Sequence, residues 1–421
     1  MTTRDESRAF WTYWAASATS SLGSAFTAIA LPLTAVLILD ATPFEMGVVA
    51  AAGYVAWIVI GLPAGPIVQR LPLRATQVAI DLARAGAIAT LPIAWWLDAL
   101  TLAHVVAVAL VISFANVIFD VANFTFLPRV VPKEQLQSRN SLMSGTQAAS
   151  QLGGPSLGGL AVQLLGAVPT LLIDAASYVA SAVLLRTLPD REPEAESDDR
   201  PGMRAMIREG WDFVVHHPIM GPCMWSATAI NFTCGGQVAL FAYYLVHVAD
   251  APSGLVGFLL AAEGVGSLVG AALVPAAVRV VGSARLCVVG GLVSAAAAFV
   301  IPVGSGWGAW VAFALGNIVF AGGVVVFSTT TRTYRQIATP PDLLSRVMAT
   351  VRFVSWGAIP VGGLVAGALG GWLGARTALF VFAALTLLSP LILMAGPIRH
   401  LRDFPDQVAT EREREVSRPR G

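Results

Sequence analysis

Six ionisable side chains lie inside long apolar stretches of this 421-residue sequence, and they are the residues that could do chemistry there. They are Asp81, Arg84, Asp120, Asp174, Glu263 and Arg352. A charged group at the centre of a bilayer costs roughly 2.5–3.5 kcal/mol on insertion scales, so few are retained without a use. A carboxylate in such a place can take up and release a proton, and an arginine can pair with it or bind an anion.

The composition places those stretches in a membrane. Hydrophobic residues make up 56% of the chain and charged residues only 12%, and the mean hydropathy is +0.71. Soluble domains carry about 25% charged residues, so a water-soluble globule is excluded. The long continuous apolar runs exclude an outer-membrane β-barrel. Three cysteines and a net charge of +1 give no reason to expect a disulfide scaffold or a nucleic-acid partner. No residue spacing indicates a metal or a cofactor.

Twelve apolar segments reach the length of about 20 residues that a helix needs to cross a bilayer core. We predict these spans at 10–39, 44–68, 75–97, 102–127, 139–164, 168–188, 218–247, 254–278, 285–303, 307–331, 344–369 and 374–396. The leader MTTRDESRAF carries charges of both signs and runs directly into the first span, so we expect no cleavable signal peptide.

The positive charges predict the orientation of these spans. Of the 26 Lys and Arg residues, Arg84 and Arg352 fall inside spans and Arg376 falls in a loop on one side, whereas the other 23 fall in termini or loops on the opposite side. Basic residues stay on the cytoplasmic side of a membrane. We therefore expect a multi-pass protein of the inner (plasma) membrane with both termini in the cytoplasm, which requires an even number of spans.

A polar segment divides the spans into two groups. We expect an N-terminal six-helix bundle at 1–188, a cytoplasmic linker at 189–217, a C-terminal six-helix bundle at 218–397 and a cytoplasmic tail at 398–421. The linker begins with an acidic stretch and continues with apolar residues at helical spacing, which indicates a short interfacial helix. His216 and His217 at its end are either a pH sensor or a solvated interfacial pair.

Matching motifs indicate that the two groups are one repeated unit. The segment 40–47 before the second span matches 250–257 before the eighth, and Asn116 in the fourth span matches Asn317 in the tenth. The offset between such pairs is roughly 200 to 210 residues. Two six-helix bundles in parallel repeat are typical of transporters, whose substrate site lies between the halves near the bilayer midplane.

Several short motifs are shared with a known family. They are Ser20-Ser21-Leu22-Gly23 and Ala30-Leu31-Pro32 in the first span, Asp81-Leu82-Ala83-Arg84 in the third, Leu127 to Pro132 after the fourth, and Gly210-Trp211-Asp212-Phe213 before the seventh. Through these motifs the chain resembles members of the major facilitator superfamily, and within it bacterial exporters of the enterobactin-exporter and macrolide-efflux type. The resemblance covers essentially the whole chain. The resemblance implies an all-α integral membrane protein with twelve transmembrane helices in two pseudo-symmetric six-helix bundles.

Two further segments match gating motifs of that superfamily in part. After the second span, Gly65, Arg70 and Arg74 match a motif whose acidic position is Gln69 here, so a salt bridge at that position is lost and the inner latch is expected to be weaker or differently wired. In the fifth span, the tail of the antiporter motif is present. Its residues are Gly154, Pro155, Gly158 and Gly159. These glycines either serve as a hinge or seal or only allow close helix packing.

The buried charges allow several arrangements. Asp81 and Arg84 are three residues apart, so they share a helix face. With Asp120 at a similar depth, they could form a three-member cluster that holds a proton, or Asp81 and Arg84 could be a static ion pair. Arg352 could bind an anionic substrate, bridge the two halves or extend toward the interface.

Glu263 is the most direct candidate for proton coupling. It lies about nine residues into its predicted span, or about 13 Å deep at 1.5 Å per residue. There it could load and release a proton, with Asp120 as a second carrier. Asp174 is predicted to lie shallower, on the outer side of the sixth span, where it could either join the coupling or only cap a helix and face water.

Polar and aromatic residues of the first, fourth, seventh and tenth spans are the expected wall of a substrate cavity. The candidates are Asn116, Asn123, Asn231, Gln237, Trp225, Phe241 and Tyr243. Aromatic walls with a few amides suit bulky amphipathic compounds. Each of these residues has an alternative role in ordinary helix packing or in an interfacial belt.

The sequence thus predicts a monomeric secondary exporter that moves small amphipathic compounds, such as drugs, siderophores or other secondary metabolites, by alternating access with proton-coupled antiport. Its expected partners are that substrate, protons and membrane lipid, with no nucleic acid, metal or cofactor. ATP-driven pumping is disfavoured because no GxxxxGK[ST] loop is present. Proton-coupled uptake is one alternative, and a membrane receptor or enzyme that transports nothing is another, although no catalytic constellation stands in the spans.

Overall fold

The computed structural model describes residues 3–61, 63–69, 71–130, 136–188, 203–340 and 343–405, and these residues form helices and short connections without a strand. The N-terminal half contains α1 Thr3–Leu37, α2 Pro43–Val59, α3 Ala64–Gln69, α4 Leu73–Trp96, α5 Leu102–Val130, α6 Leu136–Leu165 and α7 Ala167–Arg186. The C-terminal half contains α8 Met203–His216, α9 Met220–His247, α10 Ser253–Val281, α11 Ser283–Val300, α12 Gly306–Ala338, α13 Leu344–Leu373, α14 Ala375–Thr386, α15 Leu388–Ala395 and the 3₁₀-helix Pro397–His400.

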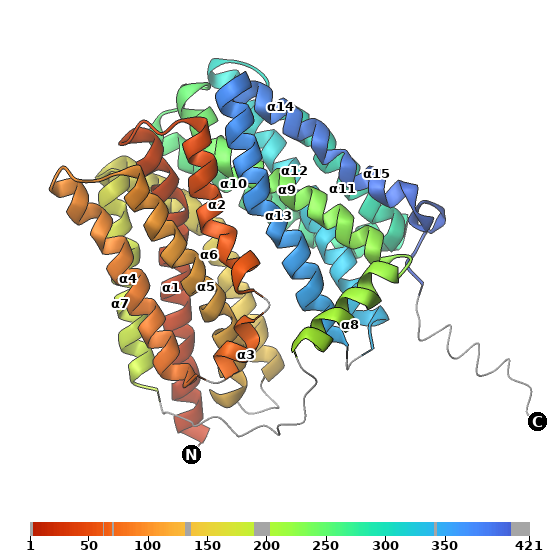
Figure 1. Ribbon diagram of the computed structural model, residues 1–421, viewed down its shortest axis with the longest axis horizontal. Helices are drawn as coiled ribbons and strands as arrows, with labels where there is room; N and C mark the ends of the chain where they lie inside the picture. The colour runs from red at the N-terminus through yellow and green to blue at the C-terminus, as the bar shows by residue number, and fades with distance from the viewer. Residues whose placement is uncertain are drawn as a thin grey trace, which may run out of the picture.

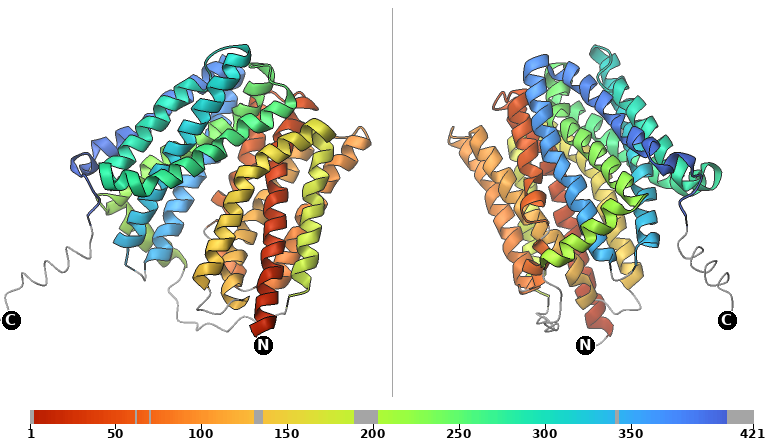
Figure 2. Two further views of the ribbon diagram at one scale, coloured as in Figure 1. Left: turned by 180° about the vertical axis from the view of Figure 1, so that it is seen from behind. Right: turned by 45° about the vertical axis from the view of Figure 1, so that its right-hand side comes forward.

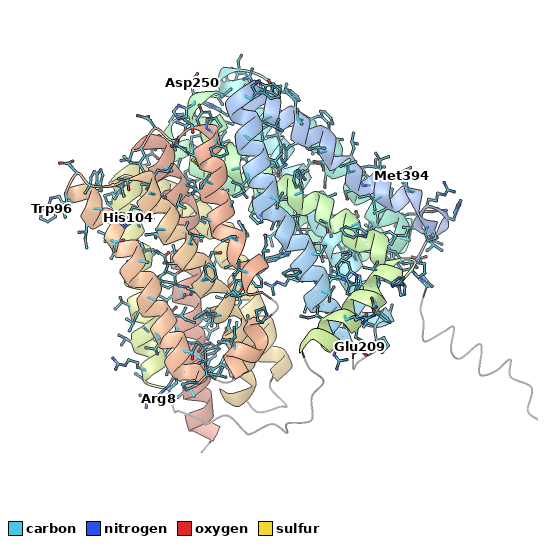
Figure 3. The ribbon with its side chains drawn as sticks, viewed as in Figure 1. Arg8, Trp96, His104, Glu209, Asp250 and Met394 are labelled. Carbon is cyan, nitrogen blue, oxygen red and sulfur yellow. The ribbon has the colours of Figure 1, made fainter. Side chains whose placement is uncertain are left out.

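The two halves stand side by side as bundles of roughly parallel rods (Figure 1). Trp96, His104 and Asp250 lie at one end of the molecule, and Arg8 and Glu209 lie at the other (Figure 3). We name these the Asp250 end and the α8 end. The halves approach each other at the Asp250 end and diverge toward the α8 end, as the further views also show (Figure 2).

The structure confirms an all-helical, multi-pass membrane fold. Among the described residues, ten helical segments are long and apolar enough to cross a membrane. They belong to α1, α4, α5, α7, α9, α10, α11, α12, α13 and the pair α14–α15. α2 is apolar but has only 17 residues, and α6 has 30 residues but begins with a run rich in Ser, Gln and Asn. The number twelve therefore remains a prediction.

Two predicted spans are interrupted where the sequence expected one helix. The second span ends at Val59 and resumes in α3 at Ala64, and the last span changes from α14 to α15 after Thr386. Pro63 and Pro390 lie four residues after Val59 and Thr386, and a proline ring clashes with the carbonyl four residues before it. Other helices continue through a proline, so proline alone does not account for the two interruptions.

The repeated Asp…Gly segment forms the same turn in both halves. Asp40 and Asp250, which follow α1 and α9, adopt the left-handed backbone region with φ of 49° and 51°. The N–H of Ala41 donates to the carbonyl of Ala35 at 3.0 Å, and the N–H of Ala251 donates to that of Leu245 at 2.8 Å. Both bonds reach six residues back. Aspartate tolerates this backbone better than most residues, which explains why it stands at both positions.

Close glycine contacts join the halves at the Asp250 end. A Cβ atom on Gly47 of α2 would lie 2.6 Å from the carbonyl oxygen of Gly363 on α13, and one on Gly159 of α6 would lie 2.5 Å from the Cα of Gly257 on α10. The missing side chains allow these backbones to touch. Within the N-terminal half, Gly154 of α6 packs against the side chain of Ala25 on α1.

The buried apolar clusters follow the same division. One cluster contains residues of both halves, including Leu33 of α1 and Leu240 of α9. The other two large clusters each belong to one half near the α8 end, one around Tyr13 and one around Met224. The halves therefore share a core at the Asp250 end and have separate cores at the α8 end.

Helix α8 lies across the α8 end of α13. Glu209 of α8 forms an ion pair with Arg346. Gly210 lies so close to α13 that a Cβ there would be 2.8 Å from the Thr350 hydroxyl. The helix occupies the segment in which the sequence predicts a short interfacial helix, and it is attached to the C-terminal half.

Candidate functional site

A cavity of about 630 Å³ lies between the two halves. We name it the central cavity. From the N-terminal half, its lining includes Ser17, Ser20, Ser21, Ser24, Tyr54, Trp57, Arg84, Asn116, Phe119, Asp120, Asn123, Asp174 and Tyr178. From the C-terminal half, it includes Val238, Phe241, Ala242, Leu260, Glu263 and Trp356. Its volume lies within the roughly 300–1,000 Å³ typical of sites for small molecules.

Asp81 and Arg84 form a buried ion pair on α4. The Arg84 guanidinium lies 3.3 Å from the Asp81 carboxylate, and the two residues are 2% and 0% exposed. The same guanidinium lies over the Phe119 ring, 4.5 Å from its centre. The second carboxylate oxygen of Asp81 has no hydrogen-bond partner among the described residues. The pairing is the one that their spacing on a helix predicts.

Asp120 pairs with the opposite half instead. Its carboxylate lies 3.8 Å from the guanidinium of Arg352 on α13, and this guanidinium lies between the rings of Trp57 and Trp356, at 4.1 and 4.4 Å. Of the predicted cluster of Asp81, Arg84 and Asp120, only the pair of Asp81 with Arg84 is in direct contact among the described residues, although the charge of Arg84 also acts on Asp120. Arg84 is turned toward Asp81, and a residue from the other bundle reaches Asp120. Of the roles considered for Arg352, the contact between halves is the one observed.

Asp174 is enclosed by the helices of its own half. It is fully buried on α7 and accepts a hydrogen bond from the Ser177 hydroxyl at 3.1 Å. The alternative that it caps a helix or faces water is wrong, because it lies inside α7 and α1 covers it. Its position toward the outer side of the span stays a prediction. At Gly23, α1 approaches so closely that a Cβ atom there would lie 2.5 Å from the Asp174 carboxylate. The next turn of α7 adds a hydrogen bond of 2.8 Å between the hydroxyls of Tyr178 and Ser24.

Glu263 of α10 is exposed to the central cavity. No hydrogen bond or ion pair holds its carboxylate within the part of the chain that the structure describes. Tyr54 of α2 and Cys234 of α9 lie close enough for its charge to act on them. Glu263 therefore differs from Asp81, Asp120 and Asp174, whose carboxylates all have a partner.

Three of the predicted wall residues border the central cavity, and four do not. Asn116, Asn123 and Phe241 line it, and Asn123 also accepts a hydrogen bond from the Tyr13 hydroxyl. Of the four others, Gln237 is buried, Asn231 and Tyr243 are half-buried, and Trp225 lines a separate apolar depression with residues of α13, α14 and α15. The cavity face of α9 is formed by Val238, Phe241 and Ala242. Asn231 and Gln237 stand seven residues before Val238 and four residues before Phe241, so they lie near the same helix face without lining the cavity.

Sequence reasoning missed the serines and tryptophans of this site. Ser17, Ser20, Ser21 and Ser24 follow helical spacing, so a polar stripe was readable from the sequence. Trp356 stands four residues after Arg352 and could have been placed on the same face. Trp57 comes from the other half, and no local signal indicates its position.

The gating segments are described in part. The Arg74 guanidinium donates a hydrogen bond of 2.7 Å to the carbonyl of Leu188, which follows α7. Gly65 and Gln69 belong to α3, whereas Arg70 and the side chains of Gln69 and Pro155 lie outside what the structure describes. Gly158 of α6 packs on α1, where a Cβ atom would lie 3.3 Å from the Cα of Phe26.

Comparison with known protein sequences identifies relatives of this chain. The family model described as transmembrane secretion effector matches residues 6–417. Multidrug efflux pump Tap of Mycolicibacterium fortuitum is 27% identical over 273 residues, which cover 61% of this chain and 64% of Tap, somewhat under two thirds of that protein. The uncharacterized MFS-type transporter YfiS of Bacillus subtilis (strain 168) is 24% identical over 388 residues, or 90% of each chain.

Solved structures share the fold. The nucleoside transporter NupG superposes with a TM-score of 0.74 at 12% identity, over 92% of this chain and 98% of its own. A bacterial homologue of the iron transporter ferroportin in an inward-facing state superposes with a TM-score of 0.71 at 15% identity, over 94% and 99%. At such identities the likeness carries the fold and nothing about the substrate.

Proposed function

The chain belongs to the transmembrane secretion effector family and is a membrane transporter of the major facilitator type, and from this premise we propose that it exports small amphipathic compounds by proton-coupled antiport. It works as a monomer in the plasma membrane, with both termini and the α8 end in the cytoplasm. The match to a multidrug efflux pump supports the direction of transport. The excess of basic residues in loops on one side supports the orientation.

The observation that carries this proposal is an unpaired carboxylate in a cavity between two joined halves. The halves share a buried core at the Asp250 end and have separate cores at the α8 end. With the α8 end in the cytoplasm, the central cavity is reached from inside the cell. This is the state in which an exporter loads its substrate.

Coupling follows from competition at Glu263. In the state open to the cytoplasm, Glu263 gives up its proton and the cavity takes the substrate. The halves then separate at the Asp250 end and close at the α8 end, the substrate leaves, and an external proton returns to Glu263. Asp120, Asp81, Arg84 and Asp174 serve as further members of the proton pathway. Asn116, Asn123, Phe241 and Arg352 contact the substrate.

The gating motifs would control the two ends. On α6, Gly154 and Gly158 pack against α1 and Gly159 packs against α10. Together with Pro155 of the same motif, they would form the outer gate. Gly65, Gln69, Arg70 and Arg74 form the inner latch, in which Arg74 ties α4 to the end of α7. Since Gln69 carries no charge, we propose that hydrogen bonds to backbone carbonyls replace an ion pair in this latch.

Everted membrane vesicles test this function. Respiration acidifies the vesicle lumen, so an exporter should accumulate fluorescent amphipathic dyes inside, and nigericin, which collapses the pH gradient, should release them. The Glu263→Gln variant should lose gradient-driven accumulation. Asp98→Asn is a matched control, because Asp98 is exposed near the Asp250 end with φ of 53°, a backbone that asparagine also accepts.

Each other outcome has a defined meaning. Gradient-driven dye loss from vesicles would indicate uptake. Accumulation that persists unchanged in Glu263→Gln would remove this residue from the coupling. A purified protein that moves no solute in liposomes under any ion gradient would contradict the whole proposal.

A further inference from the structure

A buried arginine at the α8 end of the C-terminal half has no counter-ion. Arg335, in the last turn of α12, is 8% exposed, and its Nε and Nη1 atoms are buried without a hydrogen-bond partner. Within the part of the chain that the structure describes, no carboxylate forms an ion pair with it. Arg335 does not line the central cavity, so the transport mechanism proposed above does not use it.

An arginine cannot relieve this situation by losing its proton. A buried carboxyl group or lysine can become neutral, whereas the guanidinium group stays charged throughout the physiological pH range. An unpaired charge in a protein interior is costly in free energy, so buried charges in native proteins are paired. Arg335 is therefore a position at which an anion binds with a large gain.

A second buried donor lies beside this guanidinium. The hydroxyl group of Tyr334, which is 5% exposed, also has no hydrogen-bond partner among the described residues. Both side chains lie close enough to the Cys223 thiol of α9 to interact with it electrostatically. The Tyr334 ring packs against His217 and Phe404, with ring centres at 6.2 and 4.5 Å. Donors from two side chains of α12 thus stand around one thiol of α9.

One end of the guanidinium is open to a ligand. Nη2 is the nitrogen of Arg335 that is not among the buried atoms without a partner, and no hydrogen bond of the described residues uses it, so it reaches solvent. Nη1 stands beside Nη2, so an anion that reaches Nη2 can accept two parallel hydrogen bonds. Arg332, one turn earlier on α12, is exposed and close enough for its charge to act on Arg335. It adds a second positive charge at the open end.

The depth of Arg335 corresponds to the phosphate layer of a bilayer. Trp307, near the start of α12, is 74% exposed, as is typical of a residue at a membrane interface. Arg335 stands 28 residues later, or roughly 42 Å along the helix axis at 1.5 Å per residue. A bilayer measures about 30 Å across its hydrocarbon core and about 40–45 Å with its headgroup regions. Arg335 therefore lies among the headgroups of the leaflet at the α8 end.

We propose that Arg335, with Arg332 and the Tyr334 hydroxyl group, binds a phosphate group at the α8 end of the C-terminal half. The guanidinium of Arg335 donates parallel hydrogen bonds to two phosphate oxygens. An anionic phospholipid headgroup and free phosphate offer the same chemistry, and the depth of the site favours the headgroup. Binding compensates the buried charge and therefore stabilises the folded protein.

Separate binding measurements with the two sources of phosphate test the proposal. The full-length protein is purified in a maltoside detergent and freed of lipid. It is dialysed to equilibrium against radiolabelled orthophosphate, and bound phosphatidylglycerol or phosphatidylcholine is counted by native mass spectrometry. Phosphatidylglycerol should bind saturably and at least about tenfold more tightly than the zwitterionic lipid. Saturable binding of orthophosphate would support the same site with free phosphate as its source.

Substitutions show whether the binding depends on the buried guanidinium. Arg335→Gln should weaken it at least about tenfold, and Arg335→Lys, which keeps the charge without the planar fork, about threefold to tenfold. Arg285→Gln is the matched control, because Arg285 is an exposed arginine in the first turn of α11 at the same end of the molecule. It should change the affinity less than about twofold.

Thermal unfolding distinguishes a binding role of Arg335 from a structural one. The ligand should raise the unfolding temperature of the parent protein and of Arg285→Gln, and it should leave that of Arg335→Gln unchanged. An arginine with only a structural role would lower the unfolding temperature equally with and without the ligand, which would contradict the proposal.

Absence of saturable binding of both phosphate sources to the folded protein would overturn the proposal. Unchanged binding in a folded Arg335→Gln variant would overturn it too, and so would an equal loss in Arg285→Gln, which would indicate general attraction to surface charge. These measurements impose no ion gradient and follow no transported compound. A failure of the transport function proposed above would therefore leave their outcome unaffected.

Discussion

Contacts within a half and contacts between the halves are built from different chemistry. Within the N-terminal half, Asp81 and Arg84 pair out of contact with solvent, and Asp174 is enclosed by α1 and held by Ser177. Between the halves, the Asp250 end has glycine backbones in contact, and the ion pair of Asp120 with Arg352 has side chains that are 44% and 37% exposed.

The difference indicates which contacts can break during a transport cycle. A buried ion pair that loses one member leaves an uncompensated charge, so separating its two groups is costly. A contact between glycines loses only van der Waals packing when the helices part. An exposed ion pair exchanges its partner for water at little cost. The glycine contacts and the exposed ion pair between the halves are thus easier to separate than the buried ion pair within a half.

The largest effect is expected from breaking the pair inside the half. Arg84→Met should destabilise the protein by about 3–5 kcal/mol, because Asp81 remains buried without a partner. The double variant Arg84→Met with Asp81→Asn should recover much of this loss. Thermal unfolding of the purified variants measures both. Equal stability of Arg84→Met and the parent protein would contradict the distinction between the two kinds of contact.

A smaller effect on stability, with a larger one on conformation, is expected at the glycine contact. Gly159→Ala puts a Cβ atom 2.5 Å from the Gly257 backbone, so α6 and α10 must move apart at a cost of about 1–3 kcal/mol. The Asp250 end should open more often. Met46 lines the cavity near this end. In a protein whose Cys223, Cys234 and Cys287 have been replaced, a Met46→Cys substitution should then react faster with an impermeant maleimide added to intact cells.

Gly153→Ala is the matched control on the same helix. A Cβ atom there meets nothing within 4 Å, so alanine should be neutral or slightly stabilising through its higher helix propensity. Equal maleimide rates in the two variants would show that the glycine contact does not hold the Asp250 end closed.

The helical framework could be predicted from the sequence because it depends on local properties. Length, apolar runs and the repeated Asp40 and Asp250 turns are all readable along the chain. Pro63 and Pro390 stand four residues after Val59 and Thr386, but Pro32 and Pro92 lie inside continuous helices, so proline alone did not indicate the interruptions. The interruptions were missed because the apolar run continues through both of them, so the hydropathy does not change where the helical hydrogen bonds break.

The site was harder to predict because its pairings are between distant segments. The Asp81–Arg84 pair follows from a spacing of three residues. The partner of Asp120 lies more than 200 residues away on another bundle, and the burial of Asp174 depends on how closely α1 crosses at Gly23. Which face of α9 borders the cavity also depends on the neighbours of that helix.

The junction of α8 and α9 is a surface contact within a half, and we expect it to depend on pH. The Nδ1 atom of His217 accepts hydrogen bonds from the N–H groups of Ile219 and Met220, at 3.1 and 3.2 Å, so the ring must be neutral at this atom. Burial lowers the pKa of His217 from its ordinary value of 6.5. The unfolded chain therefore binds the proton more readily, and the contribution of this cap is present above pH 6.5 and lost as the pH falls below it.

The expected size of that contribution is roughly 0.5–1 kcal/mol, as for an N-terminal cap. The difference in unfolding temperature between pH 7.5 and pH 5 should be smaller in His217→Gln, because a glutamine oxygen can accept the same bonds and does not titrate. Should the variant and the parent lose stability equally on acidification, His217 would have no part in the pH response.

The smallest effect on stability is expected for the ion pair between the halves. Because both side chains are more than a third exposed, the coupling of Asp120 to Arg352 should be roughly 0.2–0.5 kcal/mol, which changes a ratio of two states by only about twofold. Spin labels at Arg8 and Trp211, both exposed at the α8 end, report the spacing of the halves. Asp120→Asn and Arg352→Gln should shift that distance distribution slightly, and the double variant should shift it no further. A coupling of several kcal/mol would instead make this ion pair as costly to separate as the pair of Asp81 with Arg84. The two halves could not then separate at low cost.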